Sequence, residues 1–317
     1  LHLSLRRQRQ MCIRDRFYIE LWQNSKNTNL IFKMKYSSLV KRIAGESTEV
    51  WDIHNKARER FENGEDVLML SIGEESDEKT PILIQQEAIA SIQRGRHHYT
   101  QVVGQDNLRK AIAKKHQQRT SQQVKIENVC IFSGAQNALF SVCLCLLEKG
   151  DEVIVPELFY ATYPATLTAG GATFIAVPTY AEMGFQPDPK SISKAINSKT
   201  RAILLNSPNN PTGTVYSPET LKEILKLCRA HKIWVISDEV YSEIAPEGFT
   251  PIASLPGSHE QTVTISSLSK SHRMTGWRCG WMVGTEKLTQ HLANLNMCMT
   301  YGCLLYTSDA ADEGLGV

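Results

Sequence analysis

Residues 233–241 have the sequence IWVISDEVY, in which five apolar or small residues precede an aspartate. A short, continuous apolar run of this kind predicts a strand that is buried on both faces. The run ends at Asp238, where an ionised carboxylate needs a partner. A lone aspartate after a strand is also often a helix cap, so both interpretations of Asp238 stay open at this point.

The same pattern recurs along the chain from Val129 onward. Six apolar runs are strand candidates: 129–132, 152–155, 173–177, 202–205, 234–237 and 262–265. Helical patterns lie between them, at 136–147 and 218–231 for example. Strands linked by helices predict an α/β fold with a mostly parallel sheet that is covered on both faces.

Four loops follow these strands, and ligands of such sheets bind at the carboxyl ends of the strands. The loops span 133–136, 209–213, 238–241 and 266–270. The first leads into a helix whose free N–H groups suit a phosphate, although its glycine could serve packing alone. Taken singly, the second is an ordinary turn sequence. Lys270, at the end of the fourth, would by itself be taken for a surface lysine.

Composition excludes several classes of protein. Of 317 residues, 42% are hydrophobic and 21% are charged, as in ordinary globular proteins. A net charge of +2 gives no reason to expect nucleic acid or a membrane as partner. The eight cysteines have no zinc-binding spacing, which favours reduced thiols and a cytoplasmic location. His97 and His98 have no third ligand at a suitable spacing, so we expect no metal site.

The two ends of the chain look foreign to the rest. Residues 6–16 and 303–313 can be encoded by the two strands of one short DNA, which resembles the adapter of a transposase-based sequencing library. We therefore expect 1–16 and 303–317 to be adapter-derived and 17–33 to be translated upstream sequence, with Met34 as the start. Residues 1–33 carry a net charge of +5 and 303–317 one of −3, so 34–302 carry none.

The joint pattern of the loops is far more specific than each loop alone. The segment from Ser267 through Ser269, Lys270 and Arg278 to Gly280 resembles the lysine signature of class I aminotransferases, the pyridoxal-phosphate-dependent enzymes of fold-type I. Asn-Pro-Thr-Gly at 210–213 and Asp-x-x-Tyr at 238–241 follow the family's order and spacing. The resemblance covers about residues 36–302. Four further segments resemble arginine–pyruvate aminotransferases and their relatives: 34–45, 51–54, 205–208 and 236–243.

This resemblance implies a role for each motif residue. Lys270 would form the Schiff base with pyridoxal 5'-phosphate and shuttle the proton at the substrate α-carbon. Asp238 would hold the proton on the pyridinium nitrogen. Asn210 and Tyr241 would hydrogen-bond the phenolic oxygen of the cofactor. The catalytic residues are thus Lys270, Asp238 and Tyr241.

The remaining positions implied by the resemblance bind the cofactor or the substrate. The phosphate would lie against Gly134, Ala135, Gln136, Ser267, Ser269 and Arg278. Tyr160 would stack on the ring, although a core aromatic is the alternative. Tyr99 would reach the phosphate of the neighbouring subunit, which implies a homodimer. Gly73 would lie near the substrate carboxylate, but 74–77 depart from the family's Pro-Asp-Phe-like run, so this loop is uncertain.

The resemblance also implies a domain organisation. We expect an N-terminal arm and part of a small domain at 34–75, and a pyridoxal-phosphate-binding large domain with a seven-stranded sheet at 76–302. The family's C-terminal lobe, with the arginine that binds the α-carboxylate, is absent from the sequence. We therefore expect Leu292 and Leu295, on a helix beginning near Glu286, to be exposed. Residues 1–33 and 303–317 should make few buried contacts, and the chain should be poorly soluble and inactive.

The expected reaction is transfer of an amino group from an L-amino acid to a 2-oxo acid, with arginine and pyruvate favoured by the resemblance. Two alternatives stay open. A lyase of the same fold would use the same lysine, aspartate and asparagine. A regulator with an aminotransferase-like sensor domain would need a DNA-binding module, and residues 17–60 show no pattern of one.

Overall fold

The computed structural model describes residues 34–44, 47–73, 79–302, 309 and 311. The chain divides into two compact units, 1–38 and 39–317. In the first unit the description covers 34–38, which form no helix or strand. All the helices and strands described below belong to the second unit. The predicted boundaries of the arm and of the large domain stay predictions, and the N-terminal 33 residues lie outside the described part of the chain.

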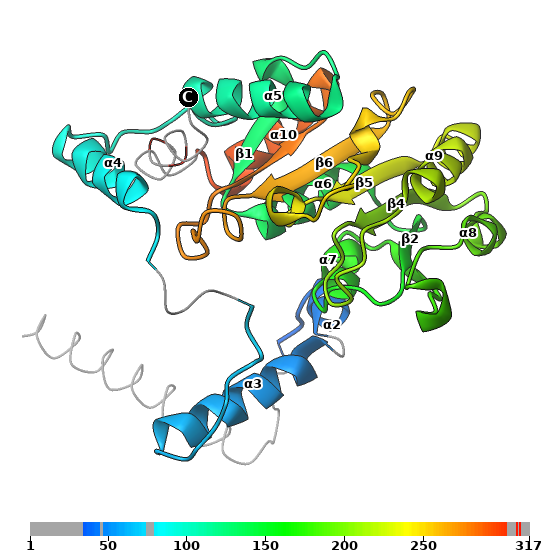
Figure 1. Cartoon of the computed structure of the whole chain (residues 1–317), viewed down its shortest axis with the longest axis horizontal. Helices are drawn as coiled ribbons and strands as arrows, with labels where there is room; N and C mark the ends of the chain where they lie inside the picture. The colour runs from blue at the N-terminus through cyan, green and yellow to red at the C-terminus, as the bar shows by residue number, and fades with distance from the viewer. Residues whose placement is uncertain (1–33, 45–46, 74–78, 303–308, 310, 312–317) are drawn as a thin grey trace, which may run out of the picture. The chain divides into compact units, whose positions relative to one another are not determined.

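Seven strands of the second unit form one sheet, as expected (Figure 1). They are β1 Val129–Phe132, β2 Glu152–Pro156, β3 Thr173–Val177, β4 Thr200–Asn206, β5 Trp234–Asp238, β6 Thr262–Ser267 and β7 Gly280–Val283. Their order is β1-β7-β6-β5-β4-β2-β3. β7 runs antiparallel to both of its neighbours, whereas the other pairs are parallel. The hydrophobic pattern had indicated six of these strands and had missed β7.

The described helices are α2 Leu39–Ile43, α3 Ser47–Glu62, α4 Ile82–Gln93, α5 Asp106–Thr120, α6 Ala135–Leu146, α7 Tyr163–Thr168, α8 Pro189–Ala195, α9 Pro218–His231 and α10 Glu286–Met299. Local sequence fixes several of their starts. Ser217 caps α9 and Thr285 caps α10, because each side-chain oxygen accepts a backbone N–H three residues on. None of these helices is both long and apolar enough to cross a membrane.

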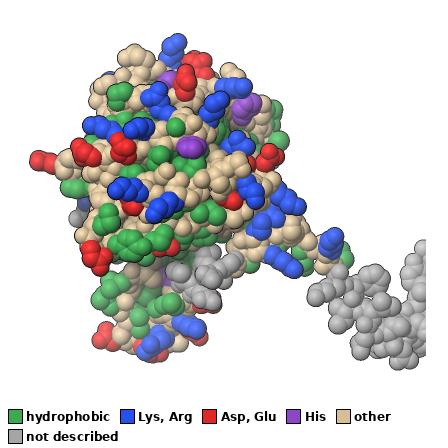
Figure 2. All heavy atoms as spheres, turned by 90° about the vertical axis from the view of Figure 1, so that its right-hand side faces the viewer, with side chains coloured by type: hydrophobic (Ala, Val, Ile, Leu, Met, Phe, Trp, Pro, Cys, Tyr) green, Lys and Arg blue, Asp and Glu red, His purple; other side chains and the backbone are tan. Residues whose placement is uncertain are grey.

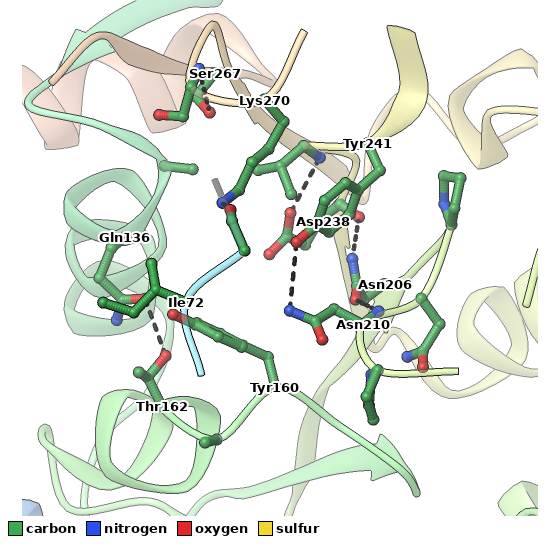
Figure 3. A pocket seen from close by; sticks show the side chains of 18 of the residues that line it. Ile72, Gln136, Tyr160, Thr162, Asn206, Asn210, Asp238, Tyr241, Ser267 and Lys270 are labelled. Atoms are coloured by element: carbon green, nitrogen blue, oxygen red, sulfur yellow. Dashed lines mark hydrogen bonds between the residues drawn. The ribbon is translucent and has the colours of Figure 1, made fainter. Parts of the chain in front are cut away.

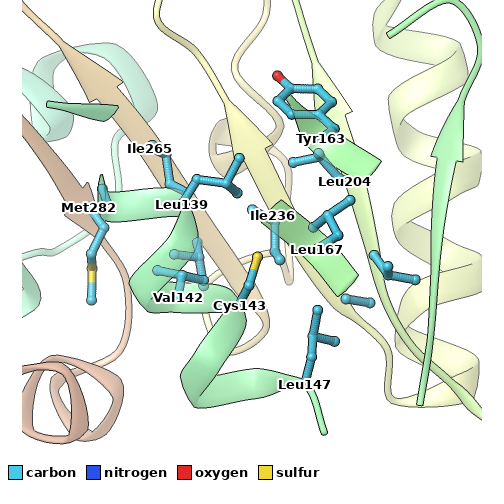
Figure 4. Packing of buried hydrophobic residues seen from close by; sticks show 14 of the residues in the cluster. Leu139, Val142, Cys143, Leu147, Tyr163, Leu167, Leu204, Ile236, Ile265 and Met282 are labelled. Atoms are coloured by element: carbon cyan, nitrogen blue, oxygen red, sulfur yellow. The ribbon is translucent and has the colours of Figure 1, made fainter. Parts of the chain in front are cut away.

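Alternate residues of most strands face two different apolar layers. On one face, α6, α7 and α10 pack against residues such as Leu204 and Ile236 (Figure 4). On the other, α5 and α4 cover β1 and β7, and α8 and α9 cover β2, β4 and β5. Burial on both faces is why most strands are rich in apolar residues, whereas β6 alternates apolar with polar residues and adds only Val263 and Ile265 to the first layer. Basic and acidic side chains both occur among hydrophobic ones on the face seen in Figure 2.

The expectation for α10 is wrong. Leu292 is fully buried, and Leu295 is partly buried against the same apolar layer. The physical reason is that α10 packs on α6 and β1, both of which belong to the large domain itself. Its apolar stripe therefore has a partner within residues 129–146 and needs no further lobe to cover it.

The expectation of few buried contacts near the C-terminus is also wrong where the structure describes that segment. Ala311 is fully buried in the layer beside α4 and α5. Asp309 accepts a hydrogen bond from Ser91 and pairs with Arg96, whose Nη2 lies 3.2 Å from the carboxylate. The other residues of 303–317 lie outside the described part of the chain, and the adapter origin of this segment stays a prediction.

Candidate active site

A cavity of about 940 Å³ lies at the carboxyl ends of β1, β4, β5 and β6. All four loops that the sequence singled out contribute to its lining. The lining residues from these loops include Ala135, Gln136, Asn209, Asn210, Asp238, Tyr241, Ser267, Ser269 and Lys270. Segment 70–73 and α3 add Ile72, Gly73, Trp51 and His54. Parallel strands end at one edge of the sheet, and this geometry brings together residues that lie far apart in sequence.

Lys270 extends into this cavity from the loop after β6 (Figure 3). Its Nζ donates a hydrogen bond of 2.6 Å to the carbonyl oxygen of Gly73, which is 197 residues away in sequence. The predicted lysine and the predicted substrate-side glycine therefore meet.

Asp238 ends β5 and is 8% exposed. The phenol of Tyr163 donates to its Oδ2 over 2.7 Å, and the backbone N–H of Val240 donates to its Oδ1 over 3.2 Å. Burial raises the pKa of Asp238, and these two hydrogen bonds oppose the rise. Asp238 therefore has partners as the sequence required, but Tyr163 was not foreseen as one of them.

Asn210 and Tyr241 come from the loops after β4 and β5. The Asn210 amide donates to the Tyr241 hydroxyl over 3.3 Å. Burial raises the pKa of Tyr241, while this hydrogen bond lowers it. Asn206 is buried and hydrogen-bonds to both loops. Its amide donates to the Asp238 carbonyl, and its Oδ1 accepts the N–H of Asn210. The motifs did not mark Asn206 as a site residue.

Arg278 lines the cavity, and Gly134 lies against the Arg278 guanidinium. Gly134 is the N-cap of α6 with φ +90°, and no described side chain caps this helix. A Cβ at Gly134 would overlap the Arg278 guanidinium. Arg278 itself has φ +56° and donates to the Thr275 carbonyl over 2.8 Å. A helix N-terminus and a guanidinium thus meet at one point, an arrangement that suits an anion.

Four further predicted residues line the same space. Ser267 Oγ accepts the N–H of Ser269 over 3.3 Å. The Gln136 side chain is held by Thr162 and Thr166, over 3.0 and 2.7 Å. Tyr160 is 38% exposed and therefore is not a core aromatic. It extends into the cavity from the opposite side to Lys270 (Figure 3).

Of the predicted cofactor ligands, Gly134 and Tyr99 are not among the residues that line this cavity. Tyr99 is 87% exposed and contacts the ring of Tyr301. His97 and His98 are exposed, and among the described residues no group of His, Cys, Asp or Glu could hold a metal ion.

Fold, cavity and motifs together define the class of protein. The chain belongs to the aminotransferase class I and II family, whose model matches residues 65–312. It is 47% identical over 283 residues to the arginine–pyruvate transaminase AruH of Pseudomonas aeruginosa, an alignment that covers 89% of this chain and 72% of that protein. It is 35% identical to the aspartate aminotransferase of Thermotoga maritima, of which it spans 66%.

Solved structures agree with this assignment. The aspartate aminotransferase of Thermus thermophilus, solved with maleate, superposes with a TM-score of 0.85 at 30% identity, over 89% of this chain and 73% of that one. The aspartate aminotransferase of Thermotoga maritima gives a TM-score of 0.83 at 34% identity. The predicted fold-type I large domain is therefore confirmed.

Proposed function

We propose that this chain catalyses transfer of an amino group from an L-amino acid to a 2-oxo acid, with pyridoxal 5'-phosphate bound through a Schiff base to Lys270. One observation carries the proposal. A single cavity presents a lysine amine, a buried carboxylate and an anion-binding corner formed by the N-terminus of α6 and Arg278. These three groups match the aldehyde, ring nitrogen and phosphate of that cofactor.

The donor set of the cavity fits pyridoxal phosphate in detail. The N-terminus of α6 at Ala135 and Gln136, with the Arg278 guanidinium, would hold the phosphate. Because the Gln136 side chain is held by Thr162 and Thr166, the backbone N–H of this residue would be its contribution. Ser267 and Ser269 supply hydroxyls on the same side, and Tyr160 supplies an aromatic face.

When bound, the cofactor supplies an electron sink for the bonds of the substrate α-carbon. The residues of the chain do the rest. Asp238 would hold the proton on the ring nitrogen, since a buried carboxylate is most stable beside a cation. Asn210 and Tyr241 would donate hydrogen bonds to the phenolic oxygen. Once the substrate has replaced it on the cofactor, the Lys270 amine would move a proton to and from the substrate α-carbon.

Arginine and pyruvate are the substrates that we propose, because the transaminase of Pseudomonas aeruginosa with 47% identity is named for them. We also propose a homodimer, in which Tyr99 reaches the phosphate of the neighbouring subunit. Its high exposure in a single chain is compatible with such a role. Gly73 would lie beside the substrate carboxylate, and its carbonyl contact with Lys270 places it at the cavity.

Borohydride trapping tests the attachment. The chain is loaded with pyridoxal phosphate, reduced and digested, and the labelled peptide is identified by mass spectrometry. We expect the label on Lys270 and no label in Lys270→Ala. Label on Lys287, which lies in α10, would refute the assignment.

A single-turnover assay tests the reaction and separates it from a lyase. L-arginine should convert bound pyridoxal phosphate to pyridoxamine phosphate, and pyruvate should restore the original absorbance. A lyase would consume the amino acid without accumulating pyridoxamine phosphate. A sensor domain would bind the amino acid and leave it unchanged.

A further inference from the structure

Arg119 of α5 holds the segment that carries Tyr241 in place. Its Nη1 donates to Ser242 Oγ over 2.9 Å and pairs with Glu243 over 2.7 Å. Its Nη2 donates to the Ser242 carbonyl over 3.2 Å. The same guanidinium lies over the ring of Phe249, 5.6 Å from its centroid. One side chain thus contacts three residues that lie 123 to 130 positions later in the sequence.

These contacts fall immediately after Tyr241. Ser242–Ile244 form the short 3-10 turn η3, and Tyr241 is its N-cap residue. The turn is closed by hydrogen bonds from the Ser242 N–H to Glu239 and from the Ile244 N–H to Tyr241. Ser242 is 7% exposed, so its side chain and carbonyl face Arg119 from a buried position. A planar guanidinium can satisfy both at once, which an ammonium group cannot do with the same geometry.

The charges around this turn agree with the contacts. Glu239, the residue after Asp238, is buried, and Ser237 Oγ donates to it over 2.9 Å. Burial raises its pKa to about 7, while Ser237 and then the Arg119 guanidinium oppose the rise. Lys115 pairs with Glu243 as well, over 2.9 Å, but no contact of Lys115 with Ser242 accompanies it.

We infer that Arg119 is a positioning residue: by fixing η3, it sets the place of the Tyr241 hydroxyl at the cofactor. It does not touch the cavity and acts through Tyr241. The part of this inference that concerns the cofactor rests on the proposed function. The part that concerns the turn does not, because all the contacts lie within the chain.

Hydrogen exchange of the cofactor-free chain tests the turn. In Arg119→Met, the amides of Ser242 and Ile244 should exchange about tenfold faster, since charge-assisted hydrogen bonds are lost. Lys115→Met is the matched control, because it removes the other ion pair to Glu243 and keeps the Ser242 contacts. It should change these rates less than about twofold. Arg119→Lys keeps the positive charge, and its amide exchange rates should lie between those of the parent and of Arg119→Met. This variant replaces Arg119→Met in the test if the methionine variant does not fold.

The pH at which the bound cofactor changes its absorbance tests the action through Tyr241. Weakening the hydrogen bond from Tyr241 to the phenolic oxygen should raise this pH by about one unit in Arg119→Met, a tenfold change in proton affinity. Tyr241→Phe should raise it similarly, and the double variant should raise it no further, because both changes remove one interaction.

Unchanged exchange in both Arg119 variants would refute the inference. Faster exchange with an unchanged absorbance midpoint, or additive shifts in the double variant, would show Arg119 to be merely structural and would refute it too. A chain that fails to bind pyridoxal phosphate would refute the proposed function instead, while the exchange result would still decide the role of Arg119 in the turn.

Discussion

Tyr163 donates a hydrogen bond to Asp238 and thereby lowers the pKa of this carboxyl, an effect that the pH dependence of cofactor affinity can test. Its hydrogen bond lowers the pKa of a carboxyl that burial raises, so Tyr163→Phe should raise that pKa further. Pyridoxal phosphate needs the ionised carboxylate at its ring nitrogen. As the pH falls, the variant should therefore lose affinity for the cofactor at a higher pH than the parent, by about tenfold at the point of largest difference.

Equilibrium dialysis across pH measures this difference. Asp238→Asn is the control. Its amide does not titrate, so the part of the pH dependence of the affinity that comes from the Asp238 carboxyl should disappear. Parallel affinity curves for Tyr163→Phe and the parent would show that the hydrogen bond has no effect on the site.

Glu239 makes a second prediction at this scale, and it concerns stability. Burial raises its folded pKa from 4.5 to about 7. Between these two values the unfolded chain has released the proton and the folded chain still binds it, so stability falls as pH rises. The loss is absent below about pH 4.5 and complete above about pH 7, where it reaches about 3 kcal/mol.

Glu239→Gln cannot titrate and should escape this loss. Urea unfolding should find the variant close to the parent at pH 5 and more stable than the parent at pH 8. An equal difference between the two proteins at both pH values would contradict the assigned titration.

At the scale of elements, the approach of β7 to α6 depends on Gly280. A Cβ at this position would overlap the backbone of Gly134 and Ala135. Backbone atoms cannot move aside as the end of a flexible side chain can. Gly280→Ala should therefore lower the free energy of unfolding by about 1–3 kcal/mol. It should also weaken binding of pyridoxal phosphate, since Gly134 and Ala135 would form the phosphate site.

Gly276→Ala, in the loop that precedes β7, is the matched control. A Cβ there would meet nothing within 4 Å. Thermal unfolding and dialysis with pyridoxal phosphate measure both effects. Equal behaviour of the two variants would show that the close approach of β7 has no energetic importance.

Sequence patterns predicted the elements that bury a continuous apolar run. Six strands were found within two residues of their observed ends, and α9 was found at its observed ends. β7 was missed because it begins with Gly280, the last residue of the lysine signature, and leaves an apolar run of only three residues, 281–283. Leu292 was misjudged because the partners of α10, which lie in α6 and β1, cannot be read from its own sequence.

The candidate site residues likewise divide into those that a sequence motif reveals and those that only the structure reveals. Lys270, Asp238, Asn210 and Tyr241 lie in motifs, and the structure brings all four to one cavity. Tyr163 and Arg119 lie in no motif. Each matters through a contact with a residue 75 or more positions away, and one sequence contains no signal of such a contact. The roles of all these residues remain proposals until they are tested.

At the scale of the whole molecule, the site joins loops from four strands and the segment at Gly73. A ligand that binds all of them stabilises the folded chain as a unit. At a concentration one hundred times its dissociation constant, pyridoxal phosphate should add about 2.7 kcal/mol to the free energy of unfolding.

Thermal unfolding with and without pyridoxal phosphate measures this stabilisation, and Lys270→Ala should show much less of it. Hydrogen exchange should slow in all four loops together. Slowing confined to the loop after β6 would contradict a site that spans the sheet.

The pairing of β1 with β7 has a consequence for synthesis of the chain. β1 leaves the ribosome about 150 residues before β7, its neighbour in the described sheet, has been synthesised. Until then both edges of β1 lack a partner strand, and Gly134 has no Arg278 beside it. The anion-binding corner can therefore be completed only after residue 280 has been synthesised, and a nascent chain that stalls earlier exposes a further strand edge that is open to wrong pairing.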